Sequence, residues 1–389
     1  MLPSRYHADV RPAYGCGNGL RCSLHGHAMW GIICYGFLRT GNLPERKTSL
    51  RAHVRARRIG LSRRGLRVRP DVKHVLSVTQ FDRQFLLQLF HRADEFAALP
   101  PREIAPVARG AIMATLFYEP STRTRLSFEA AMTRLGGSVI SAEYAASTSS
   151  AAKGESIEDT ARVVAGYADL LVIRHPVAGS VARAAAVTDV PVINAGDGAN
   201  EHPTQALIDL YTIWRECGRI DGLTVALVGD LRFGRAARSL ARLLTQTVGT
   251  KIYLVAPPVT RMDPLLVEEL RSTGLEVEEA DDLVAIAPEV DVLYQTRIQR
   301  ERFGDPNEYA AACGRYVVDQ RLMRALPRHA IVLHPLPRVG EIDPEVDTDP
   351  RAAYFRQARN GVPLRMALIE WVLTPHPVTV LSTNGHRHA

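Results

Sequence analysis

Hydrophobic and polar positions along this chain follow two alternating patterns. Short apolar runs are typical of buried strands, whereas longer segments with apolar residues three or four positions apart are typical of helices. Strands are predicted at 111–117, 169–173, 191–194, 223–228, 252–255, 290–294 and 331–333. Helices are predicted at 81–98, 126–135, 156–166, 181–187, 204–216, 236–244, 264–272 and 363–373. The segment 138–155 is rich in Ser, Ala and Gly and has neither period, which predicts a mobile loop.

The order of these elements predicts the fold class. Strands and helices alternate with short links, which is typical of a parallel sheet covered by helices on both faces. The alternation pauses at the sequence CGRIDG and then restarts. We therefore predict an α/β protein of two doubly wound parallel-sheet domains joined by a short hinge. The predicted parts are a leader at 1–70, domains at 71–217 and 218–360, a last helix at 361–374 and a tail at 375–389.

A polar segment, residues 121–125 with the sequence STRTR, follows the first predicted strand. Ser121 is a good N-cap for the next helix, in which Leu126, Phe128 and Met132 are predicted to face a core. Free N–H groups at a helix start, two hydroxyls and guanidinium groups together suit a bound phosphate. An ordinary charged helix start would contain the same residues, so this segment alone leaves both interpretations open.

Six motifs along the chain carry a family resemblance. They are FYEPSTRTRLSFE at 117–129, VIRHP at 172–176, NAGDGANEHPTQ at 194–205, VGDLRFGR at 228–235, YQTRIQRER at 294–302 and HPLPR at 334–338. In sequence and order they resemble the aspartate and ornithine carbamoyltransferase family, over about residues 73–373. The resemblance implies that the last helix packs back on the first domain, and that a carbamoyl group passes from carbamoyl phosphate to an amine without a cofactor or metal.

The resemblance assigns carbamoyl phosphate mainly to the first domain. Its contacts are expected from Ser121, Thr122, Arg123, Thr124, Arg174, His202, Gln205, Pro335 and Leu336. Arg174 is expected to bridge phosphate and carbonyl, and His202 with Thr124 to polarise the carbamoyl oxygen. Gln205 and the backbone carbonyls of Pro335 and Leu336 are expected to hold the carbamoyl amine. An oxyanion develops in such a reaction, so fixed donors and guanidiniums are the groups it requires.

The amine substrate is expected in the second domain. By resemblance, Arg235 pairs with the α-carboxylate of aspartate, Arg297 and Gln299 bind its side-chain carboxylate, and Leu336 completes the aspartate site. Arginine suits this task because its planar fork binds carboxylates through two hydrogen bonds. Ornithine enzymes have Cys in place of Pro335, so the aspartate branch of the family is favoured. Within that branch the region 73–373 most resembles the plant type. The nearby charged residues Arg300 and Arg302 are predicted to be solvated.

Two nucleotide-binding motifs are excluded by the same segment. Gly229 and Gly234 have the spacing of a P-loop, but Arg235 replaces the required Lys and Ala236 replaces the Ser or Thr that would hold magnesium. The segment also lacks G-x-G-x-x-G, so it does not support a dinucleotide fold.

The resemblance also implies a homotrimer with shared active sites. Ser149 and Lys153 match residues that enter the site of the neighbouring subunit, which makes Lys153 a catalytic and aspartate-binding candidate together with Arg123, Thr124, Arg174 and His202. Two positions depart from relatives. Ala152 stands where many bacterial members have a second Lys, and Thr148 where plant members have Phe. Nucleotide feedback of the plant kind is therefore not implied.

The charge of the chain is concentrated at its start. The whole chain carries a formal +7, yet the first 70 residues contain 13 Arg and one Lys against one Asp and one Glu, so the remainder is acidic. A nucleic-acid binder inferred from this charge would rest on the leader alone. An Arg-rich leader with few acids also fits a plastid transit peptide, but it contains only four Ser, and a disordered or untranslated leader is favoured.

Cysteine usage and hydropathy indicate a cytoplasmic protein. The five Cys are odd in number and lack C-x-x-C spacing, which argues against a disulfide framework or a zinc site. The most apolar early run, at 28–38, is too short to span a bilayer. We predict an aspartate-specific enzyme of early pyrimidine synthesis, without nucleic acid or membrane partners. The alternative is that the chain is inactive and serves as a structural partner of another pyrimidine enzyme such as dihydroorotase. If the chain is active, dihydroorotase or a regulatory chain is a possible partner of the enzyme.

Overall fold

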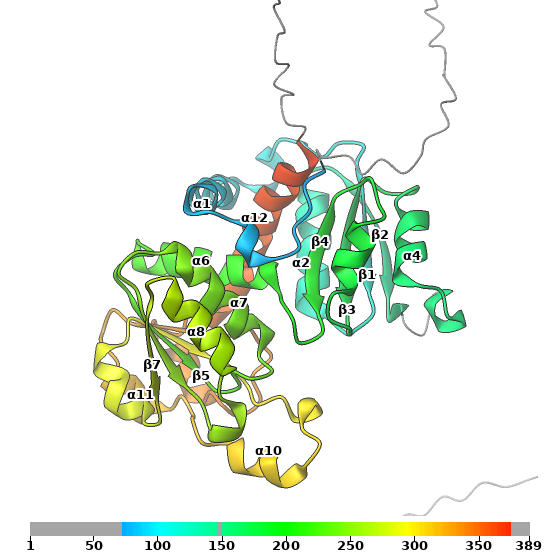
Figure 1. The fold of residues 1–389 in the computed structure, drawn as a ribbon. Coiled ribbons are helices and arrows are strands. Elements are labelled where there is room, and N and C mark those ends of the chain that lie inside the picture. The colour runs from blue at the N-terminus through cyan, green and yellow to red at the C-terminus, as the bar shows by residue number, and fades with distance from the viewer. Residues whose placement is uncertain (1–71, 146–149, 375–389) are drawn as a thin grey trace, which may run out of the picture. The chain divides into compact units, whose positions relative to one another are not determined.

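The computed structural model describes residues 72–145 and 150–374. The predicted leader at 1–70, the tail at 375–389 and residues Thr148 and Ser149 lie outside the described residues. The described chain forms two parallel sheets with helices on their faces (Figure 1), which confirms the predicted fold class.

The first sheet has the strand order β2-β1-β3-β4, with every neighbouring pair parallel. Its strands are β1 (Ile112–Phe117), β2 (Ser138–Glu143), β3 (Leu170–His175) and β4 (Val192–Asp197). The connecting helices are α2 (Thr122–Arg134), α4 (Ile157–Val164) and α5 (Ser180–Ala185). Because the strands are parallel, the motifs that follow β1, β3 and β4 all lie at one edge of this sheet.

The second sheet has the strand order β7-β6-β5-β8-β9 and is also parallel throughout. Its strands are β5 (Thr224–Val228), β6 (Lys251–Val255), β7 (Glu276–Ala280), β8 (Val292–Gln295) and β9 (Ile331–Leu333). Its helices are α7 (Arg235–Leu243), α8 (Pro264–Ser272), α9 (Leu283–Ile286), α10 (Pro306–Ala312) and α11 (Gln320–Ala325). The remaining three motifs follow β5, β8 and β9, again at the carboxyl ends of strands.

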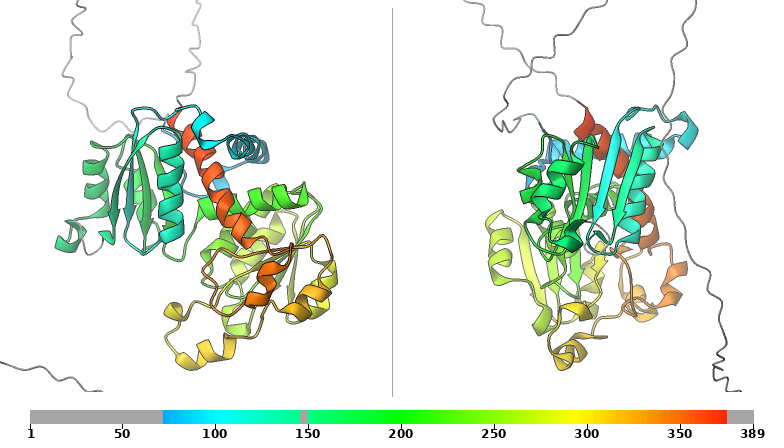
Figure 2. Two further views of the ribbon diagram at one scale, coloured as in Figure 1. Left: turned by 180° about the vertical axis from the view of Figure 1, so that it is seen from behind. Right: turned by 90° about the vertical axis from the view of Figure 1, so that its right-hand side faces the viewer.

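Three long helices pack together: α1 (Arg83–Ala98), α6 (Pro203–Cys217), which links the two sheets along the chain, and α12 (Tyr354–Leu373). Helix α12 packs against α1, α2 and α6, so the last described helix returns to the first sheet (Figure 2). Arg92 of α1 pairs with Glu370 of α12 at 2.6 Å. Short 3-10 turns complete the described chain at 78–80, 101–103, 150–153, 244–246, 258–260, 287–289, 300–302 and 344–348.

Each strand of the first sheet contributes to two apolar layers. In β1, Met113 and Phe117 belong to the large core that also includes residues of α1, α6 and α12, whereas Ala114 and Leu116 face a second core beneath α4 and α5. This alternation follows from the two-residue period of a strand. The large core continues into the second sheet through residues such as Leu227 of β5. The two sheets are thus held by one continuous apolar interior.

Two segments differ from the predicted elements at the edges of the sheets. The predicted loop at 138–155 is wrong at its start, because β2 occupies Ser138–Glu143. This strand is largely exposed at the end of the sheet, and so its sequence lacks a buried face. Strand β7 was not predicted, because it also lies at an edge and only Val277 in it is buried. Helices α9, α10 and α11 are short and were missed as well.

The last helix begins earlier than its sequence predicts. Asn360 and Gly361 were interpreted as a boundary before it, but α12 runs from Tyr354 to Leu373 and includes both residues and Pro363. A side chain at position 361 would approach Arg365 Nη1 to 2.6 Å and Ile208 to 3.3 Å. Glycine therefore serves close packing here, and tertiary contacts outweigh its low helix propensity.

Leu126 is a further correction. It was expected to face the core of α2 together with Phe128 and Met132, which are indeed fully buried. The side chain of Leu126 is instead 49% exposed.

Across residues 72–145 and 150–374, the structure contains no helix with the length and apolar character needed to cross a bilayer.

Candidate active site

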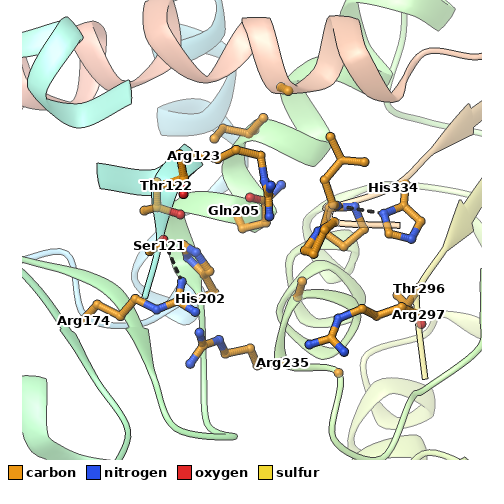
Figure 3. Close-up of a pocket in the computed structure, with 18 of the residues that line it drawn as sticks. Ser121, Thr122, Arg123, Arg174, His202, Gln205, Arg235, Thr296, Arg297 and His334 are labelled. Carbon is orange, nitrogen blue, oxygen red and sulfur yellow. Dashed lines mark hydrogen bonds between the residues drawn. The ribbon is translucent and has the colours of Figure 1, made fainter. Parts of the chain in front are cut away.

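A cavity of about 560 Å³ lies where loops from both sheets meet. Twelve of the residues predicted from sequence line it: Ser121, Thr122, Arg123, Thr124, Arg174, His202, Gln205, Arg235, Arg297, Gln299, Pro335 and Leu336. Figure 3 shows Arg123, Arg174 and His202 on one side of this cavity and Arg297 and His334 on the other. The fold therefore gathers residues that are more than 200 positions apart in the chain.

The start of α2 faces the cavity. Ser121 occupies the N-cap position, but its hydroxyl makes no capping hydrogen bond to the helix, contrary to the capping role expected from sequence. Its Oγ instead accepts a hydrogen bond from Arg174 Nη1 at 3.2 Å (Figure 3). The first N–H groups of α2 thus remain available at the positive end of the helix dipole, which favours an anion.

Two guanidinium groups from different sheets share one carboxylate. Glu119 Oε2 lies 3.3 Å from Arg174 Nε and 3.5 Å from Arg235 Nη1. Burial and the repulsion of Arg235 lower the pKa of Arg174 to about 10, against the attraction of Glu119. Both side chains are mostly buried, with exposed fractions of 17% and 14%. A cationic pair of this kind is suited to a substrate that brings more than one negative charge.

Arg235 reaches from the second sheet to the first. It is the first residue of α7, and its Nη1 donates to the carbonyl of Gly198 at 2.7 Å. A Cβ atom at Gly196 would lie 2.9 Å from the Arg235 guanidinium carbon, so the absence of a side chain there admits the guanidinium. Gly196 also has φ of +113°, a conformation that favours glycine.

His202 is buried at the N-cap of α6. Its backbone N–H donates to Ser239 Oγ at 3.1 Å. Burial, followed by the charges of Arg235 and Arg174, lowers the pKa of His202 well below its usual value. The imidazole is therefore neutral at physiological pH, and it can polarise an oxygen by donating one hydrogen bond rather than by carrying a charge.

The second-sheet side of the cavity is organised by Asp230. Its Oδ1 accepts from the backbone N–H of Phe233 at 2.8 Å, and its Oδ2 accepts from Gln299 Nε2 at 3.4 Å. Asp230 thereby links the turn after β5 to the loop after β8. Arg297, in the same loop, forms an ion pair with Glu301, which also lines the cavity.

The loop after β9 has an unusual backbone held by a buried histidine. Leu336 has φ of +56°, which non-glycine residues adopt only where surrounding contacts enforce it. Its N–H donates to His334 Nδ1 at 2.8 Å, and His334 Nε2 lies 2.7 Å from Glu341 Oε1. Because Nδ1 accepts, Nε2 carries the proton and donates to Glu341. This pair holds the segment that presents the carbonyls of Pro335 and Leu336.

Lys153 is the one predicted and described site residue that does not line the cavity. It lies at the end of the 3-10 turn Ser150–Lys153 and is exposed. Ser149, its expected companion, lies outside the described residues. The single chain therefore supplies a cavity without this lysine.

Among the cavity residues that were not assigned roles from the sequence, four are ionisable: Glu119, Glu301, His334 and Arg365. Glu119, Glu301 and His334 lie inside motifs that had been recognised, so their positions were a usable signal. Arg365 had no such signal. It is buried on α12, with its guanidinium 4.6 Å from the centre of the Phe128 ring, and burial lowers its pKa to about 9.

Among the described residues no cluster of three or more His, Cys, Asp or Glu is arranged to hold a metal ion.

Comparisons with known proteins agree with this geometry. The model of the aspartate/ornithine carbamoyltransferase carbamoyl-P binding domain matches residues 73–215, and that of the Asp/Orn binding domain matches residues 221–372. The chloroplastic aspartate carbamoyltransferase of Oryza sativa subsp. japonica is 54% identical over 306 residues, covering 77% of this chain and 84% of the rice protein. The catalytic subunit of aspartate carbamoyltransferase from Thermococcus gammatolerans is 52% identical over 299 residues, covering 77% of this chain and 96% of that subunit.

A solved structure extends the likeness to three dimensions. Aspartate transcarbamoylase from Trypanosoma cruzi, in complex with carbamoyl phosphate and aspartate, has a TM-score of 0.73 to this chain and 40% sequence identity, covering 79% of this chain and 100% of that one. Sequence motifs, parallel sheets and cavity lining thus lead to one assignment. The chain belongs to the aspartate/ornithine carbamoyltransferase family.

Proposed function

We propose that this protein transfers the carbamoyl group of carbamoyl phosphate to the amine of L-aspartate, an early step of pyrimidine synthesis. The observation that carries the proposal is the convergence of Arg123 and Arg174 with Arg235 and Arg297 on one cavity, two from each sheet. Two substrates with several negative charges between them match four guanidiniums, and the relatives described above have this activity by name.

The first-sheet side of the cavity suits carbamoyl phosphate. We assign the phosphate to Ser121, Thr122, Arg123 and Thr124 at the start of α2, with Arg174 beside them. These groups neutralise the phosphate as it leaves, and the neutral His202 donates to the carbamoyl oxygen. Preorganised donors of this kind are typically worth about 2.7–4 kcal/mol each in the transition state.

The second-sheet side suits aspartate. We assign its α-carboxylate to Arg235, its side-chain carboxylate to Arg297 and Gln299, and a share of the contact to Leu336. The amine attacks the carbamoyl carbon, the new C–N bond forms as the bond to the phosphate oxygen breaks, and the amine proton leaves with phosphate. Holding both substrates in line supplies roughly 7–11 kcal/mol toward the barrier. Ornithine would place a cationic side chain beside Arg297, which opposes its binding.

The direct test measures phosphate release from carbamoyl phosphate by the purified protein. Aspartate, ornithine and buffer are compared as acceptors. We expect release with aspartate only, and its loss in Arg174→Ala. Release that is equal with ornithine would contradict the aspartate assignment, and no release from folded protein would support the alternative of an inactive structural partner.

We further propose that the enzyme is a homotrimer in which Lys153 enters the cavity of a neighbouring subunit. Lys153 is exposed and does not line the cavity of its own chain, which supports this. Leu126 of α2 and Ile140 of the adjacent strand β2 are apolar yet 49% and 42% exposed, as residues at a subunit contact are. Dihydroorotase or a regulatory chain remains a proposed further partner.

Mixed trimers test the shared site. Arg123→Ala and Lys153→Ala should each be almost inactive alone, because each removes one half of every site. When the two variants are refolded together, a site is complete if its Arg123 comes from a Lys153→Ala chain and its Lys153 comes from an Arg123→Ala chain. Random mixing restores about a quarter of the sites. No recovery in trimers shown to be mixed would remove Lys153 from the catalytic residues.

We place the enzyme in the cytoplasm, or in a plastid if residues 1–70 act as a transit peptide. The rice and Arabidopsis thaliana relatives are chloroplastic by name, which supports the second location. Fusing residues 1–71 to a fluorescent protein and following plastid import distinguishes the two: import supports the plastid, and a fusion that stays in the cytoplasm supports the cytoplasm.

A further inference from the structure

A buried carboxylate lies behind the cavity wall. Asp209 is on α6, four residues after Gln205, and is fully buried. Its Oδ1 accepts hydrogen bonds from Gln205 Nε2 at 2.7 Å and from Gln357 Nε2 at 2.6 Å. Its Oδ2 accepts from the hydroxyl of Tyr294 at 2.7 Å. Asp209 therefore joins α6, α12 and β8, although it does not line the cavity itself.

The ionised carboxylate determines which way both amides point. A carboxylate only accepts hydrogen bonds, whereas a glutamine has a donor at one end of its amide and an acceptor at the other. With each nitrogen directed at Asp209, each oxygen is directed away from it. For Gln357 the outcome is visible, because its Oε1 accepts from the backbone N–H of His334 at 2.9 Å. Gln205 lines the cavity, so its oxygen is the end left for a ligand (Figure 3).

The branch through Gln357 reaches the loop after β9. It holds the backbone N–H of His334, whose ring in turn holds the N–H of Leu336 and donates to Glu341. The carbonyls of Pro335 and Leu336 belong to this segment. One oxygen atom of Asp209 thus restrains two elements of the cavity wall, one on α6 and one after β9.

We propose that Asp209 is a positioning residue that makes the site for the carbamoyl amine an all-acceptor site, through Gln205 on one side and Gln357 with His334 on the other. The inference rests on the proposed function, because it presumes that carbamoyl phosphate binds in this cavity. An amine with two N–H groups finds acceptors there. A methyl group of the same size would leave those acceptors without partners, which is costly in a buried site.

The charge state of Asp209 agrees with this role. Burial raises the pKa of Asp209 to about 7, while donors from Tyr294, Gln357 and Gln205 and the charge of Arg365 act to lower it. Above that pH the ionised group can only accept. Below it a protonated Asp209 could donate to one amide and permit it to turn over.

The test compares carbamoyl phosphate with acetyl phosphate, in which a methyl group replaces the amine. The measured quantity is the ratio of the inhibition constant of acetyl phosphate to the KM of carbamoyl phosphate, at a pH above 7. Asp209→Ala should lower this ratio about tenfold, the worth of one well-placed hydrogen bond. In a Gln205→Ala background the same change should have a smaller effect, because one of its two branches is already missing.

Two matched controls separate positioning from general stability. Asp209→Asn keeps an acceptor oxygen for both glutamines, with its nitrogen facing the Tyr294 hydroxyl, and should retain the ratio. Tyr294→Phe removes only the bond to Oδ2 and should also retain it, although it lowers stability. If Asp209→Ala does not fold, Gln357→Leu cuts the branch to His334 alone and should lower the ratio several-fold.

The outcomes are distinguishable from failure of the proposed function. An inactive wild-type protein would refute the function itself. An active wild type with an unchanged ratio in folded Asp209→Ala, or in folded Gln357→Leu where the first does not fold, would overturn the inference. A fall in the ratio in Tyr294→Phe as large as the fall in Asp209→Ala would also overturn the inference, since Tyr294→Phe leaves both glutamine hydrogen bonds to Asp209 in place.

Discussion

Replacing Arg297 with alanine is expected to weaken aspartate selectively. The side chain lies at the cavity with 28% of its surface exposed and is paired with Glu301 in the same loop. A guanidinium and a carboxylate in contact at about 3.5 Å, at an effective dielectric of about 20, attract each other by roughly 5 kcal/mol. Partial exposure and desolvation of the substrate reduce this, so we expect a loss of about 3–4 kcal/mol. That corresponds to a fall in kcat/KM for aspartate of roughly 10²- to 10³-fold.

Stability should hardly change in this variant. Glu301, the partner that loses its ion pair, is 54% exposed, and exposed ion pairs contribute about 0–1 kcal/mol. Arg297→Lys should give an intermediate loss, because lysine retains the charge but not the planar pair of donors. Arg300→Ala is the matched control. It removes a neighbouring, exposed arginine that does not line the cavity, and it should change aspartate kinetics by less than about twofold.

The assay follows phosphate release while aspartate is varied at saturating carbamoyl phosphate. Binding of phosphonoacetate, measured by calorimetry, reports separately on the phosphate side of the cavity. We expect the calorimetric affinity of Arg297→Ala to match the wild type within about twofold. Equal weakening of both ligands, or an effect of Arg300→Ala as large as that of Arg297→Ala, would refute the division of the cavity into two substrate sites.

Four further changes give independent checks. Arg123→Ala should weaken phosphonoacetate binding and turnover, the opposite selectivity to Arg297→Ala, as measured by the same two assays. The pKa of His202 is lowered in the folded protein, so as the pH falls below about 6.5 the imidazole binds a proton in the unfolded chain only. The stability of the wild type relative to His202→Asn, measured by urea unfolding, should therefore fall by up to about 1.4 kcal/mol per pH unit. The pKa of Asp209 is raised to about 7, so between pH values of about 3.8 and 7 the carboxyl is protonated in the folded protein and ionised in the unfolded chain. The stability of the wild type relative to Asp209→Asn should therefore rise as the pH falls through that window, by at most about 4 kcal/mol. A chain that starts at residue 72 should keep full activity, because it retains Lys73, whose Nζ donates to the carbonyl of Trp371 at 2.8 Å; a folded but inactive product would show that the leader is required.

The places of the motifs in the fold could be predicted, because they depend on the hydrophobic pattern of the few residues on either side of each motif. Apolar runs marked seven of the nine strands that the described residues form, and every recognised motif lies at or just after the carboxyl end of a strand. Parallel pairing then places these ends at one edge of each sheet, which is a general property of α/β folds. Strands β2 and β7 escaped prediction because an edge strand buries little, and its sequence therefore carries no strong period.

Partners of the charged groups could not be predicted in the same way. Arg174, Arg235 and Glu119 were all visible as residues, but their ion pairs join positions 55 or more apart in the chain and two different sheets. The same holds for Asp209, whose partner Gln357 lies 148 positions away. Such contacts depend on how the sheets pack, and no pattern over a few neighbouring residues encodes that distance.

The sequence by itself determined seven strands, the main helices and the parallel α/β class, because hydrophobic period acts over a few positions at a time. The resemblance of its motifs to a known family pointed to twelve residues of the cavity wall. Only the tertiary structure decided that α12 continues through Gly361, that Leu126 faces outward and that Lys153 lies away from its own cavity. These features depend on close packing, burial and ion pairing between distant segments. Their energies arise when the sheets and long helices come together, and not before.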